Sequence, residues 1–551
     1  MRRREFIKLS ASASALGLLP SEIGRTLKAL NSSVNCDTTN RRLVLIELKG
    51  GNDGLNTIIP MDNYSYYKNS LRPDIHIPVN SSNYNSLVVD SSLSGSLQDL
   101  AFNPALLTGN NQGFKGLYNA GMLRIMQSVG YPSQNKSHFA SIDLWATGND
   151  GNSWDNGKES GWMGRFMENA YAEVFPTNYP FAIQMGSNNT WLGFHAEHEH
   201  GLALNIEGQN SENFYTILSG LAGQAPTNIP NTHHGDEINY IVQTDAFSNT
   251  YANSIETAYN NGSNYNDSAY YPDTDLSNQL KTVARLIRGG IETKIFLVTI
   301  GGFDTHNNQN QSNNDINGRH TELIKELSGA VDAFVSDINS DSIGDDIVGL
   351  TFSEFGRKAK QNNNLGTDHG EIAPMFVFGK PVKGGISGNN VDLNEANSNN
   401  NWQIQTVQYD YRQVFSTLMQ DFLGANDSII DKTFFDHTNQ VSFSDKKISD
   451  IINPNSKLDP SCYSLGISDV KNSNNLIVYP NPAVGLLFIK SSNLKEAEYS
   501  IYSLDAKLVM RNKFNFISGE HKIDISNVNS GTYLFELSSN SKKTYKKIII
   551  N

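Results

Sequence analysis

The stretch KIFLVTIGGFDTH, residues 294–306, carries the pattern that decides the fold. Its first part is a continuous run of mostly β-branched or apolar residues, which predicts a parallel strand covered on both faces. Gly301 and Gly302 predict a turn, and the turn leads to Asp304 and His306. In open α/β sheets, ligands bind outside the carboxyl ends of such strands. We therefore expect Asp304 and His306 to lie at a ligand-binding edge.

Two further predicted strands also end on an acid. The run Leu43–Leu48 is followed by a pair of glycines and then by Asp53, which repeats the plan of the opening stretch. The run Ile347–Phe352 leads to Glu354 and Arg357. Because the carboxyl ends of parallel strands meet at one edge of a sheet, we expect the three carboxylates to share that edge.

Two loops add histidines to this set. The motif GTDHG places His369 between glycines, just before another predicted strand, and a loop after the predicted strand Leu123–Ser128 carries Ser137 and His138. Carboxylates and neutral imidazoles without thiolates suit Zn²⁺, Mn²⁺ or a similar divalent ion. A cation would also relieve the repulsion between gathered carboxylates, which raises their pKa values. We expect one or two divalent ions, with zinc as the first candidate.

Each of these motifs also has a structural interpretation. The motif GGNDG is typical of a turn, and Asp304 could cap a following helix that holds His306 in its first turn. His138 could be a packed loop histidine, and Arg357 could form a surface ion pair. The recurrence of acid-ended strands favours the shared site over these separate interpretations.

Length and composition exclude some classes of protein. The chain has 551 residues, and single hydrophobic cores stop growing at about 250–300 residues, so we expect more than one domain. The net charge is −13 and no block of Lys or Arg lies between the two ends, which argues against nucleic acid as a partner. Two cysteines, Cys36 and Cys462, are too few for a disulfide framework or a thiolate zinc site.

Residues 1–35 have the pattern of an export signal. They begin with MRRREFIKLSASASALGLLP, in which three arginines precede a short run rich in Ser and Ala. Such a run is a poor membrane span, and its order is typical of a signal peptide. The segment RREFIK resembles the twin-arginine (Tat) signal, which exports folded proteins. The alternative is a basic amphipathic helix that stays in the mature protein.

The last part of the sequence has the pattern of a separate β-domain. Residues 445–475 are a linker by composition, and residues 476–551 form short alternating runs separated by Asn, Gly and Ser, which predict a small antiparallel β-sandwich. The motifs YPNP and GTYLFEL and a Lys-rich last strand resemble the type A sorting domain of the type IX secretion system of Bacteroidetes. The alternative is an Ig-like carbohydrate-binding or adhesive module, and the YPNP opening counts against it.

The resemblance to the sorting domain implies an exported protein. It implies the type IX secretion machinery as a partner, passage across the outer membrane, and then release or attachment to surface polysaccharide. We therefore expect the protein at the outer cell surface or outside the cell.

The predicted body, residues 41–444, resembles a known family. Its motifs GGNDGLN, SHFASIDLWATG, GGFDTHNNQ, SEFGR, GTDHG and DYRQVFSTLM are similar, in this order, to those of the secreted DUF1501 proteins, a family placed near the alkaline phosphatase and sulfatase superfamily. The resemblance implies an α/β fold, a three-layer α/β/α sandwich with metals at the carboxyl edge of a mixed sheet.

The same resemblance implies roles for single residues. Asp53 and Glu354 would bind one metal, and Asp304, His306 and His369 would bind a second. The chain departs from the superfamily where Glu354 is followed by Phe rather than the usual Asp-His pair, and in the short spacing between Asp304 and His306. We therefore expect one of the two metal sites to be altered or lost.

These residues predict a mechanism. Two cations would polarise a phosphoryl or sulfuryl oxygen and activate a hydroxyl nucleophile. Ser137 is the candidate nucleophile, and His138 beside it either deprotonates Ser137 or binds substrate. The forked guanidinium of Arg357 could hold an anionic substrate.

Two classes of function follow from this sequence. In the first, the protein is a secreted metal-dependent hydrolase of phosphate or sulfate esters. In the second, it is a non-catalytic surface binding or structural protein on a degenerate hydrolase scaffold, because a fold does not fix a function. The missing histidine after Glu354 favours the second class, and the retained Asp53, Asp304, His306 and His369 favour the first.

Overall fold

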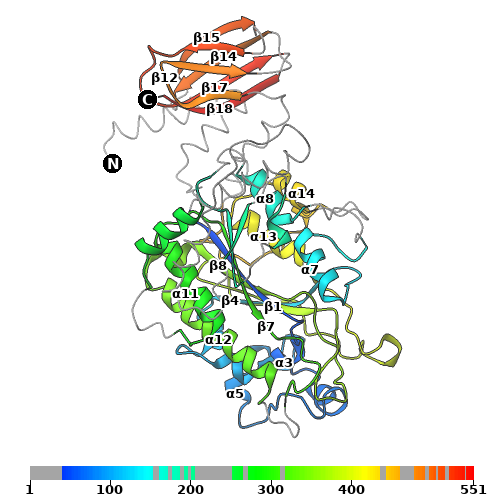
Figure 1. Cartoon of the computed structure of the whole chain (residues 1–551). Helices are drawn as coiled ribbons and strands as arrows, with labels where there is room; N and C mark the ends of the chain where they lie inside the picture. The colour runs from blue at the N-terminus through cyan, green and yellow to red at the C-terminus, as the bar shows by residue number, and fades with distance from the viewer. Residues whose placement is uncertain are drawn as a thin grey trace, which may run out of the picture. The chain divides into compact units, whose positions relative to one another are not determined.

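The computed structural model describes the chain in several ranges, and the molecule divides into two compact units. The described residues are 40–152, 160–171, 177–186, 191–196, 200–204, 251–264, 271–310, 317–434, 442–458, 477–490, 496–503, 507–515, 520–539 and 542–550. One unit, the body, lies within Asp37–Lys457, and the other contains the described residues of the C-terminal segment (Figure 1). The predicted export signal and both cysteines lie outside the described residues.

A mixed sheet forms the centre of the body. Its strands follow the order β10-β4-β9-β8-β1-β7-β5-β6, and β11 pairs with β4. Strand β9 runs antiparallel to β4 and β8, whereas the other pairs are parallel. The strands are β1 (Arg42–Lys49), β4 (Leu123–Gly130), β5 (Ala182–Met185), β6 (Gly201–Leu204), β7 (Ile295–Gly301), β8 (Ile347–Phe352), β9 (Ala373–Phe378), β10 (Gly385–Ser387) and β11 (Tyr409–Asp410).

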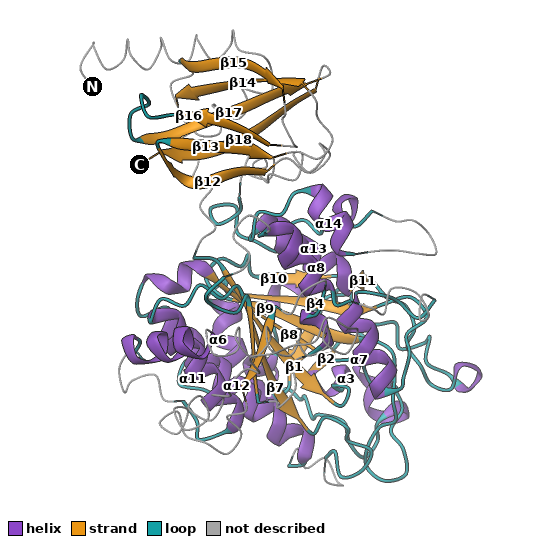
Figure 2. Ribbon diagram, turned by 45° about the horizontal axis from the view of Figure 1, so that its top comes forward, coloured by secondary structure: helices purple, strands orange, loops and turns teal. Residues whose placement is uncertain are grey.

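Helices cover both faces of this sheet (Figures 1 and 2). Alternate side chains of β1 enter two separate cores, Val44 and Ile46 on one face and Leu43 and Leu45 on the other, as expected for a strand buried on both sides. The predicted three-layer α/β/α sandwich is therefore confirmed. The first face carries α6 (Gly113–Asn119), α11 (Asp275–Arg288) and α12 (Arg319–Ile338), and the second carries α7 (His138–Thr147), α8 (Trp162–Ala170), α13 (Tyr411–Asp421) and α14 (Asp427–Thr433).

Short elements follow β1 and bring the chain back over its end. They include a small two-stranded antiparallel sheet of β2 and β3. A single π-helical turn, Tyr67–Leu71, directly precedes Arg72, a residue important for the site below. The other elements are α3 (Gly54–Thr57), β2 (Ile58–Pro60), α4 (Tyr64–Tyr66), α5 (Tyr84–Leu87) and β3 (Leu100–Phe102).

The body extends beyond the point at which a linker was predicted. Ile448, Ile451 and Ile452 are buried in the core beneath α13 and α14. Lys447 and Lys457 both pair with the buried carboxylate of Asp421, at 2.7 and 2.8 Å. The segment looked like a linker because most of its residues are polar, but a few isoleucines suffice to fix it to the body.

The C-terminal unit is built from strands alone in its described part. They follow the order β15-β14-β17-β18-β12-β13-β16 and pair antiparallel, except for β12 with β18. Side chains such as Leu487, Ile501 and Phe535 form one core, which confirms a separate β-domain. The strands are β12 (Ile477–Val484), β13 (Leu486–Lys490), β14 (Glu496–Ser503), β15 (Leu508–Asn515), β16 (Glu520–Asp524), β17 (Gly531–Ser539) and β18 (Lys542–Ile550).

Neither unit offers a membrane-spanning helix within the described residues. None of the helices there combines the length and the apolar character needed to cross a bilayer.

Candidate metal centre

Three neighbouring strands bring their following residues to one edge of the sheet. β1 lies between β7 and β8, and the turn after β1 contacts both neighbours. The backbone N–H of Gly50 donates to Glu354 Oε1 at 2.8 Å, and the N–H of Phe303 donates to the carbonyl of Lys49 at 3.0 Å. Gly50 has φ +119°, and a Cβ there would lie 2.3 Å from the nitrogen of Asp304, so this close approach requires glycine.

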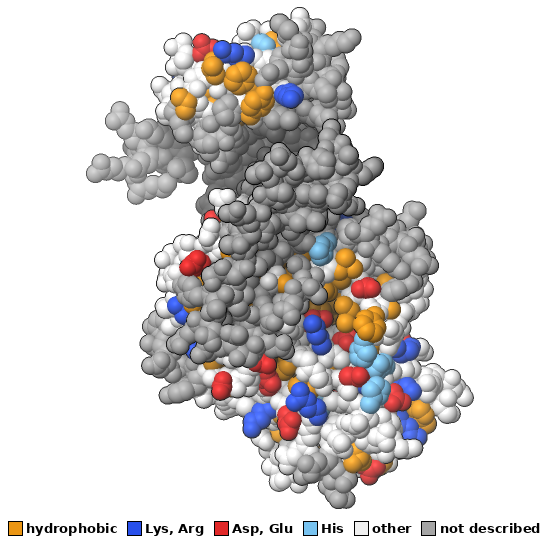
Figure 3. Space-filling view, viewed as in Figure 1, with side chains coloured by type: hydrophobic (Ala, Val, Ile, Leu, Met, Phe, Trp, Pro, Cys, Tyr) orange, Lys and Arg blue, Asp and Glu red, His pale blue; other side chains and the backbone are white. Residues whose placement is uncertain are grey.

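Histidines from two more segments reach the same edge. His138 is the first residue of α7, which follows β4. His369 precedes β9, and because β9 runs antiparallel to its neighbours, the residues before it lie where the parallel strands end. The space-filling view shows His side chains gathered on the surface of the body, bordered by acidic and basic side chains (Figure 3). The predicted convergence of segments far apart in the sequence is thus present for these histidines and Asp304.

We call His138, Asp304, His306 and His369 the candidate centre. Nε2 of His306 and Nε2 of His369 each lie 3.1 Å from Oδ1 of Asp304 and 3.0 Å from each other. Nε2 of His138 lies 3.4 Å from Oδ2 of Asp304. One ligand atom each from His138, Asp304 and His369 can be chosen so that all lie within 4.8 Å of one another, close enough to share a metal ion.

The other nitrogen of each imidazole has a partner of its own. Nδ1 of His138 lies 2.8 Å from Oε1 of Glu354, and Nδ1 of His369 lies 2.8 Å from the carbonyl oxygen of Lys136. Nδ1 of His306 lies 3.5 Å from Oδ1 of Asp368. An acceptor at Nδ1 fixes the proton there and leaves the Nε2 lone pair free, which is the usual arrangement of metal-binding histidines. All three histidines therefore present Nε2 towards Asp304.

This geometry places Glu354 behind the candidate centre. Glu354 is 2% exposed, and its Oε1 is shared between Gly50 and His138. The resemblance implied that Glu354 binds a metal directly, whereas the contacts show a carboxylate that orients His138. His138, expected as a base or substrate ligand, lies instead among the possible metal ligands.

Burial and neighbouring charges shift the pKa values of Asp304, His138 and His369. Burial alone would raise the pKa of Asp304, but the hydrogen bond and charge of Arg357 outweigh it and hold the pKa below its usual value. The hydrogen bond to Glu354 raises the pKa of His138 against the opposing effect of burial. Burial lowers the pKa of His369. Asp304 is therefore a carboxylate, and His369 is neutral, near neutral pH.

Arg357 occupies a different place from the one expected. Its side chain is fully buried, and its nitrogens donate to the carbonyls of Gly50, Gly51, Phe303 and Thr367 and to Oδ1 of Asp304. These contacts tie together the turns after β1 and β7 and hold Asp304. The guanidinium is thus committed to the backbone and to a candidate ligand, and it is not directed at an external anion.

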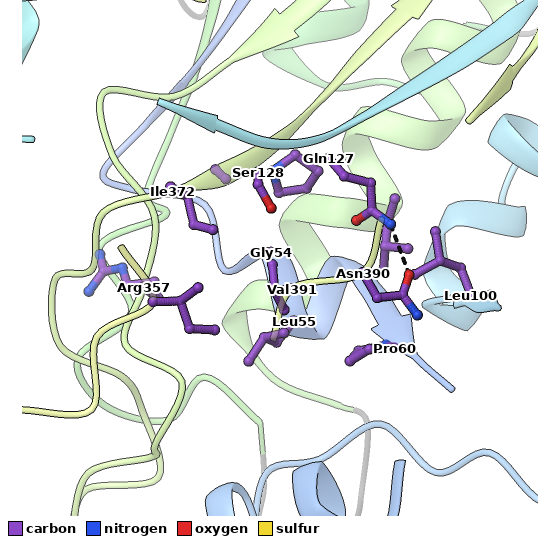
Figure 4. A pocket seen from close by; sticks show the side chains of 14 residues that line it. Gly54, Leu55, Pro60, Leu100, Gln127, Ser128, Arg357, Ile372, Asn390 and Val391 are labelled. Carbon is purple, nitrogen blue, oxygen red and sulfur yellow. Dashed lines mark hydrogen bonds between the residues drawn. The ribbon is translucent and has the colours of Figure 1, made fainter. Parts of the chain in front are cut away.

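A small cavity lies on the other side of Arg357. It has a volume of about 30 Å³, which is room for one or two waters, and its lining is largely apolar. Figure 4 shows that Leu55, Ile372 and Val391 line it, whereas the guanidinium of Arg357 points away from it. A hydrogen bond of 2.9 Å joins Gln127 to Asn390 at its far end. This cavity does not contain the candidate centre.

Asp53 lies at the same edge of the sheet but is sealed. It is 1% exposed, and its Oδ2 accepts hydrogen bonds from Nη1 of Arg72, at 2.5 Å, and from Gln309. Burial would raise the pKa of Asp53, but the charge and hydrogen bond of Arg72 outweigh it and lower that pKa. No contact within the described residues joins the Asp53 carboxylate to Asp304 or to the histidines of the candidate centre. A guanidinium therefore stands where the resemblance implied a metal.

Ser137 and Asp304 have clear positions relative to the helices. Ser137 is the exposed N-cap residue of α7, and its side chain makes no capping hydrogen bond. The described residues that follow Asp304, up to residue 310, form no helix, and α12 begins at Arg319 with Gly318 as its N-cap, so Asp304 is not a helix cap. The capping interpretation of Asp304 and His306 is thereby excluded.

Some residues of the site had no functional prediction. Asp368 stands next to His369 in GTDHG, so the motif contained a signal for it. Lys136 and Lys358 pair with Glu371 and Asp368, at 2.8 and 3.2 Å, and border the candidate centre. Arg72 had no signal, because it lies in a connecting segment without periodicity and its partner is set by the tertiary fold.

Comparisons with known proteins agree with both predicted resemblances. Residues 254–423 match the model of DUF1501, described as a protein of unknown function. Residues 477–551 match the model of a secretion system C-terminal sorting domain. The predicted resemblances are confirmed for these ranges, and no curated protein matches the sequence. The sorting domain indicates export to the cell surface or extracellular space and implies interaction with the type IX secretion machinery.

Several solved structures are similar to parts or most of the chain. Dimeric latent PorU from Porphyromonas gingivalis is 22% identical over 14% of this chain and 9% of PorU, with a TM-score of 0.12. The lipoteichoic acid synthase LtaP from Listeria monocytogenes is 10% identical over 91% of this chain and 92% of its own, with a TM-score of 0.27. A protein of the alkaline phosphatase superfamily from Vibrio parahaemolyticus is 9% identical over 94% and 81%, also with a TM-score of 0.27. These scores are too low to assign an activity.

Proposed function

We propose that the protein is an exported metal-dependent hydrolase of phosphate or sulfate esters. In this proposal His138, Asp304, His306 and His369 bind a divalent ion, with zinc as the first candidate. The observation that carries the proposal is the shared orientation of three imidazoles, each presenting Nε2 to one carboxylate. Nδ1 is hydrogen-bonded in His138 and His369 and lies 3.5 Å from Asp368 in His306.

The distances between neighbouring candidate ligand atoms are close to those around a bound zinc ion. Zinc binds nitrogen and oxygen at about 2.0–2.1 Å, so its tetrahedral ligands lie about 3.3 Å apart. Nε2 of His306 and Nε2 of His369 each lie 3.1 Å from Oδ1 of Asp304, and Nε2 of His138 lies 3.4 Å from Oδ2 of the same carboxylate. Nε2 of His306 and Nε2 of His369 lie 3.0 Å apart, a distance that suits either a hydrogen bond between them or two ligands of one ion.

The surroundings of the candidate centre suit an anionic ester. Asp304 is 44% exposed on its side chain, so a substrate can approach from solvent. Lys136 and Lys358 lie at the border, but each is paired with an acid, so the positive charge for a phosphate or sulfate group would come mainly from the bound ion. A bound divalent ion would polarise the ester and make a nearby hydroxyl more acidic.

Ser137 is the proposed nucleophile. Its hydroxyl is exposed, it directly precedes His138, and it lies at the N-terminus of α7, where backbone N–H groups favour an anionic group. Attack by this hydroxyl predicts that Ser137→Ala keeps the metal and loses about a thousandfold in kcat. A variant with full turnover would show that Ser137 is not the nucleophile.

The proposal is tested on the purified exported protein by elemental analysis and by turnover of p-nitrophenyl phosphate and p-nitrophenyl sulfate. We expect bound metal in the wild type and none in Asp304→Asn. Asp345→Asn is a matched control, because Asp345 is an exposed acid paired with Lys380 and remote from the histidine contacts. Full metal content in Asp304→Asn would contradict the proposal.

The Asp53–Arg72 pair favours a second candidate function. A scaffold that has lost one cation place could serve as a non-catalytic binding or structural protein at the cell surface. In that case, attachment to surface polysaccharide would follow from the sorting route. Bound metal without turnover of either ester would favour this second function.

A further inference from the structure

Arg72 is built into the protein as a fixed cation. Its side chain is fully buried, and besides Asp53 it donates to the carbonyls of Lys358 and Ala359 and to Oδ1 of Asn56. Its guanidinium also lies 5.9 Å from the ring of Tyr67. An arginine is charged at all pH values at which proteins fold, so the positive charge beside Asp53 is permanent.

We propose that Arg72 replaces a second divalent ion, so that the protein binds one ion and prefers esters with a single negative charge. This inference rests on the proposed function, because it concerns the number of ions and the substrate class of the same site.

Arg72 prevents a metal from binding at Asp53. A divalent ion at Oδ1 of Asp53, which has no hydrogen-bond partner among the described residues, would lie close to a guanidinium that cannot leave. The donors of Arg72 are held by the carbonyls of Lys358 and Ala359 and by the side chains of Asp53 and Asn56. Moving Arg72 aside would bury its charge without a partner, which is strongly unfavourable. Full burial also keeps Arg72 from touching a substrate, so its charge only cancels that of Asp53.

The remaining charges around the candidate centre set its preference. The acids exceed the basic side chains by one, so the site without metal carries one negative charge. A single divalent ion changes the net charge of the site to one positive charge. A bound monoanion brings this charge to zero, whereas a bound dianion leaves one negative charge. The groups counted are Asp304, Glu354, Asp368 and Glu371 against Lys136, Arg357 and Lys358.

Two kinds of ester share this charge, namely sulfate monoesters and phosphate diesters. A phosphate monoester carries close to two negative charges at neutral pH, because its second pKa is about 6. Two divalent ions at a site without Arg72 would suit such a dianion better. Arg72, by taking the place of the second ion, therefore favours monoanionic esters over dianionic phosphate monoesters.

The number of bound ions is the first test. The full exported chain is loaded with zinc, dialysed and analysed for zinc per chain. We expect one ion in the wild type and one in the double variant Asp53→Asn/Arg72→Met, which removes both buried charges together and so leaves none unpaired. Two ions in the wild type and one in the double variant would overturn the inference. No ion in the wild type would instead reject the proposed function, and the inference with it.

The charge preference is the second test. Zinc-loaded protein is titrated calorimetrically at about pH 8, where a phosphonate carries two charges, with phenylphosphonate, its monomethyl ester and benzenesulfonate. We expect both monoanions to bind about tenfold tighter than phenylphosphonate, the effect of one charge at a partly solvated site. Tighter binding of phenylphosphonate would overturn the inference.

Turnover distinguishes the two sources of a monoanionic ester. Hydrolysis of p-nitrophenyl sulfate would identify sulfate monoesters, and hydrolysis of bis(p-nitrophenyl) phosphate would identify phosphate diesters. Either result supports the inference. Preferential hydrolysis of p-nitrophenyl phosphate would contradict it.

Discussion

Asp304 and Asp53 follow neighbouring strands of one sheet, yet they have opposite surroundings. Both come after a strand and a pair of glycines. The Asp304 side chain is 44% exposed and faces three imidazoles, whereas Asp53 is 1% exposed and faces Arg72. The same sequence plan thus produces an open ligand in one case and a buried ion pair in the other.

The segments that follow the two strands explain this difference. After β1 the chain enters α3 at once, and the returning segment lays Arg72 over Asp53. After β7 the described residues 302–310 form no helix, and α12 begins at Arg319, so no helix covers Asp304 in this stretch. An acid at a strand end is therefore available as a ligand when it stays exposed, and it forms a buried ion pair when a following segment covers it.

The largest expected effect comes from the open acid. Asp304→Asn keeps the shape of the side chain but removes the charge that a cation and three histidines share. We expect loss of bound metal and a fall in kcat/KM of about a thousandfold or more. The substitution also removes the carboxylate paired with the buried Arg357, but Arg357 keeps its four carbonyl partners, so we expect a smaller loss of unfolding free energy than in Asp53→Asn. Normal turnover in this variant would remove Asp304 from the site.

Substitution of the buried Asp53 should lower stability and leave metal binding unchanged. Asp53→Asn leaves the buried Arg72 without its counterion, which costs about 3–5 kcal/mol of unfolding free energy. Metal content should stay equal to that of the wild type. Urea unfolding and elemental analysis of the same sample check both parts, and a stable variant that has lost metal would reverse the comparison.

Glu47 extends the comparison to a buried acid without a guanidinium. Burial raises the pKa of Glu47 to about 7, with a further contribution from Glu354, while Lys49 at 3.5 Å opposes the shift. The folded state therefore holds a proton that the unfolded chain releases near 4.5, the ordinary pKa of a glutamate. This contribution to stability is complete below the unfolded pKa and is lost as the pH rises through the folded pKa.

The expected loss from Glu47 is about 3 kcal/mol across that interval. Glu47→Gln should remove this part of the pH dependence, because its side chain is neutral throughout. Urea unfolding at a series of pH values checks the slope. An equal slope in wild type and Glu47→Gln would show that Glu47 does not cause it.

Chelation should give the smallest effect. A ligand present at a hundredfold its Kd stabilises the folded state by about 2.7 kcal/mol, so removing zinc at that concentration should lower the melting temperature of the wild type. Asp304→Asn should not respond, whereas Asp53→Asn should respond as the wild type does. If chelation no longer lowers the melting temperature of Asp53→Asn, the metal binds at Asp53 and not at Asp304, which would contradict the account.

The sequence predicted those features that depend on local pattern. The apolar runs of β1, β7 and β8 and their glycine turns indicated buried strands with acids at one edge, and the structure has them there. Asp304, His306 and His369 lie together because parallel strands end, and the antiparallel β9 begins, at that edge. Metal binding by these residues stays a prediction.

The sequence did not reveal features that depend on side-chain partners across the fold. Arg72 comes from a connecting segment, and nothing near it marks Asp53 as its partner. Arg357 has the sequence context of a substrate ligand, but its nitrogens serve carbonyls of three other segments. Glu354 has the position of a metal ligand, yet its Oε1 is occupied by Nδ1 of His138 at 2.8 Å.

The most direct test of the central claim is an anomalous difference map from crystals of the zinc-loaded exported protein, measured at the zinc absorption edge. We predict one peak at the candidate centre, bounded by Asp304 and the three histidines, with Arg72 still paired to Asp53. A peak at Asp53, or no peak at the candidate centre, would contradict the account.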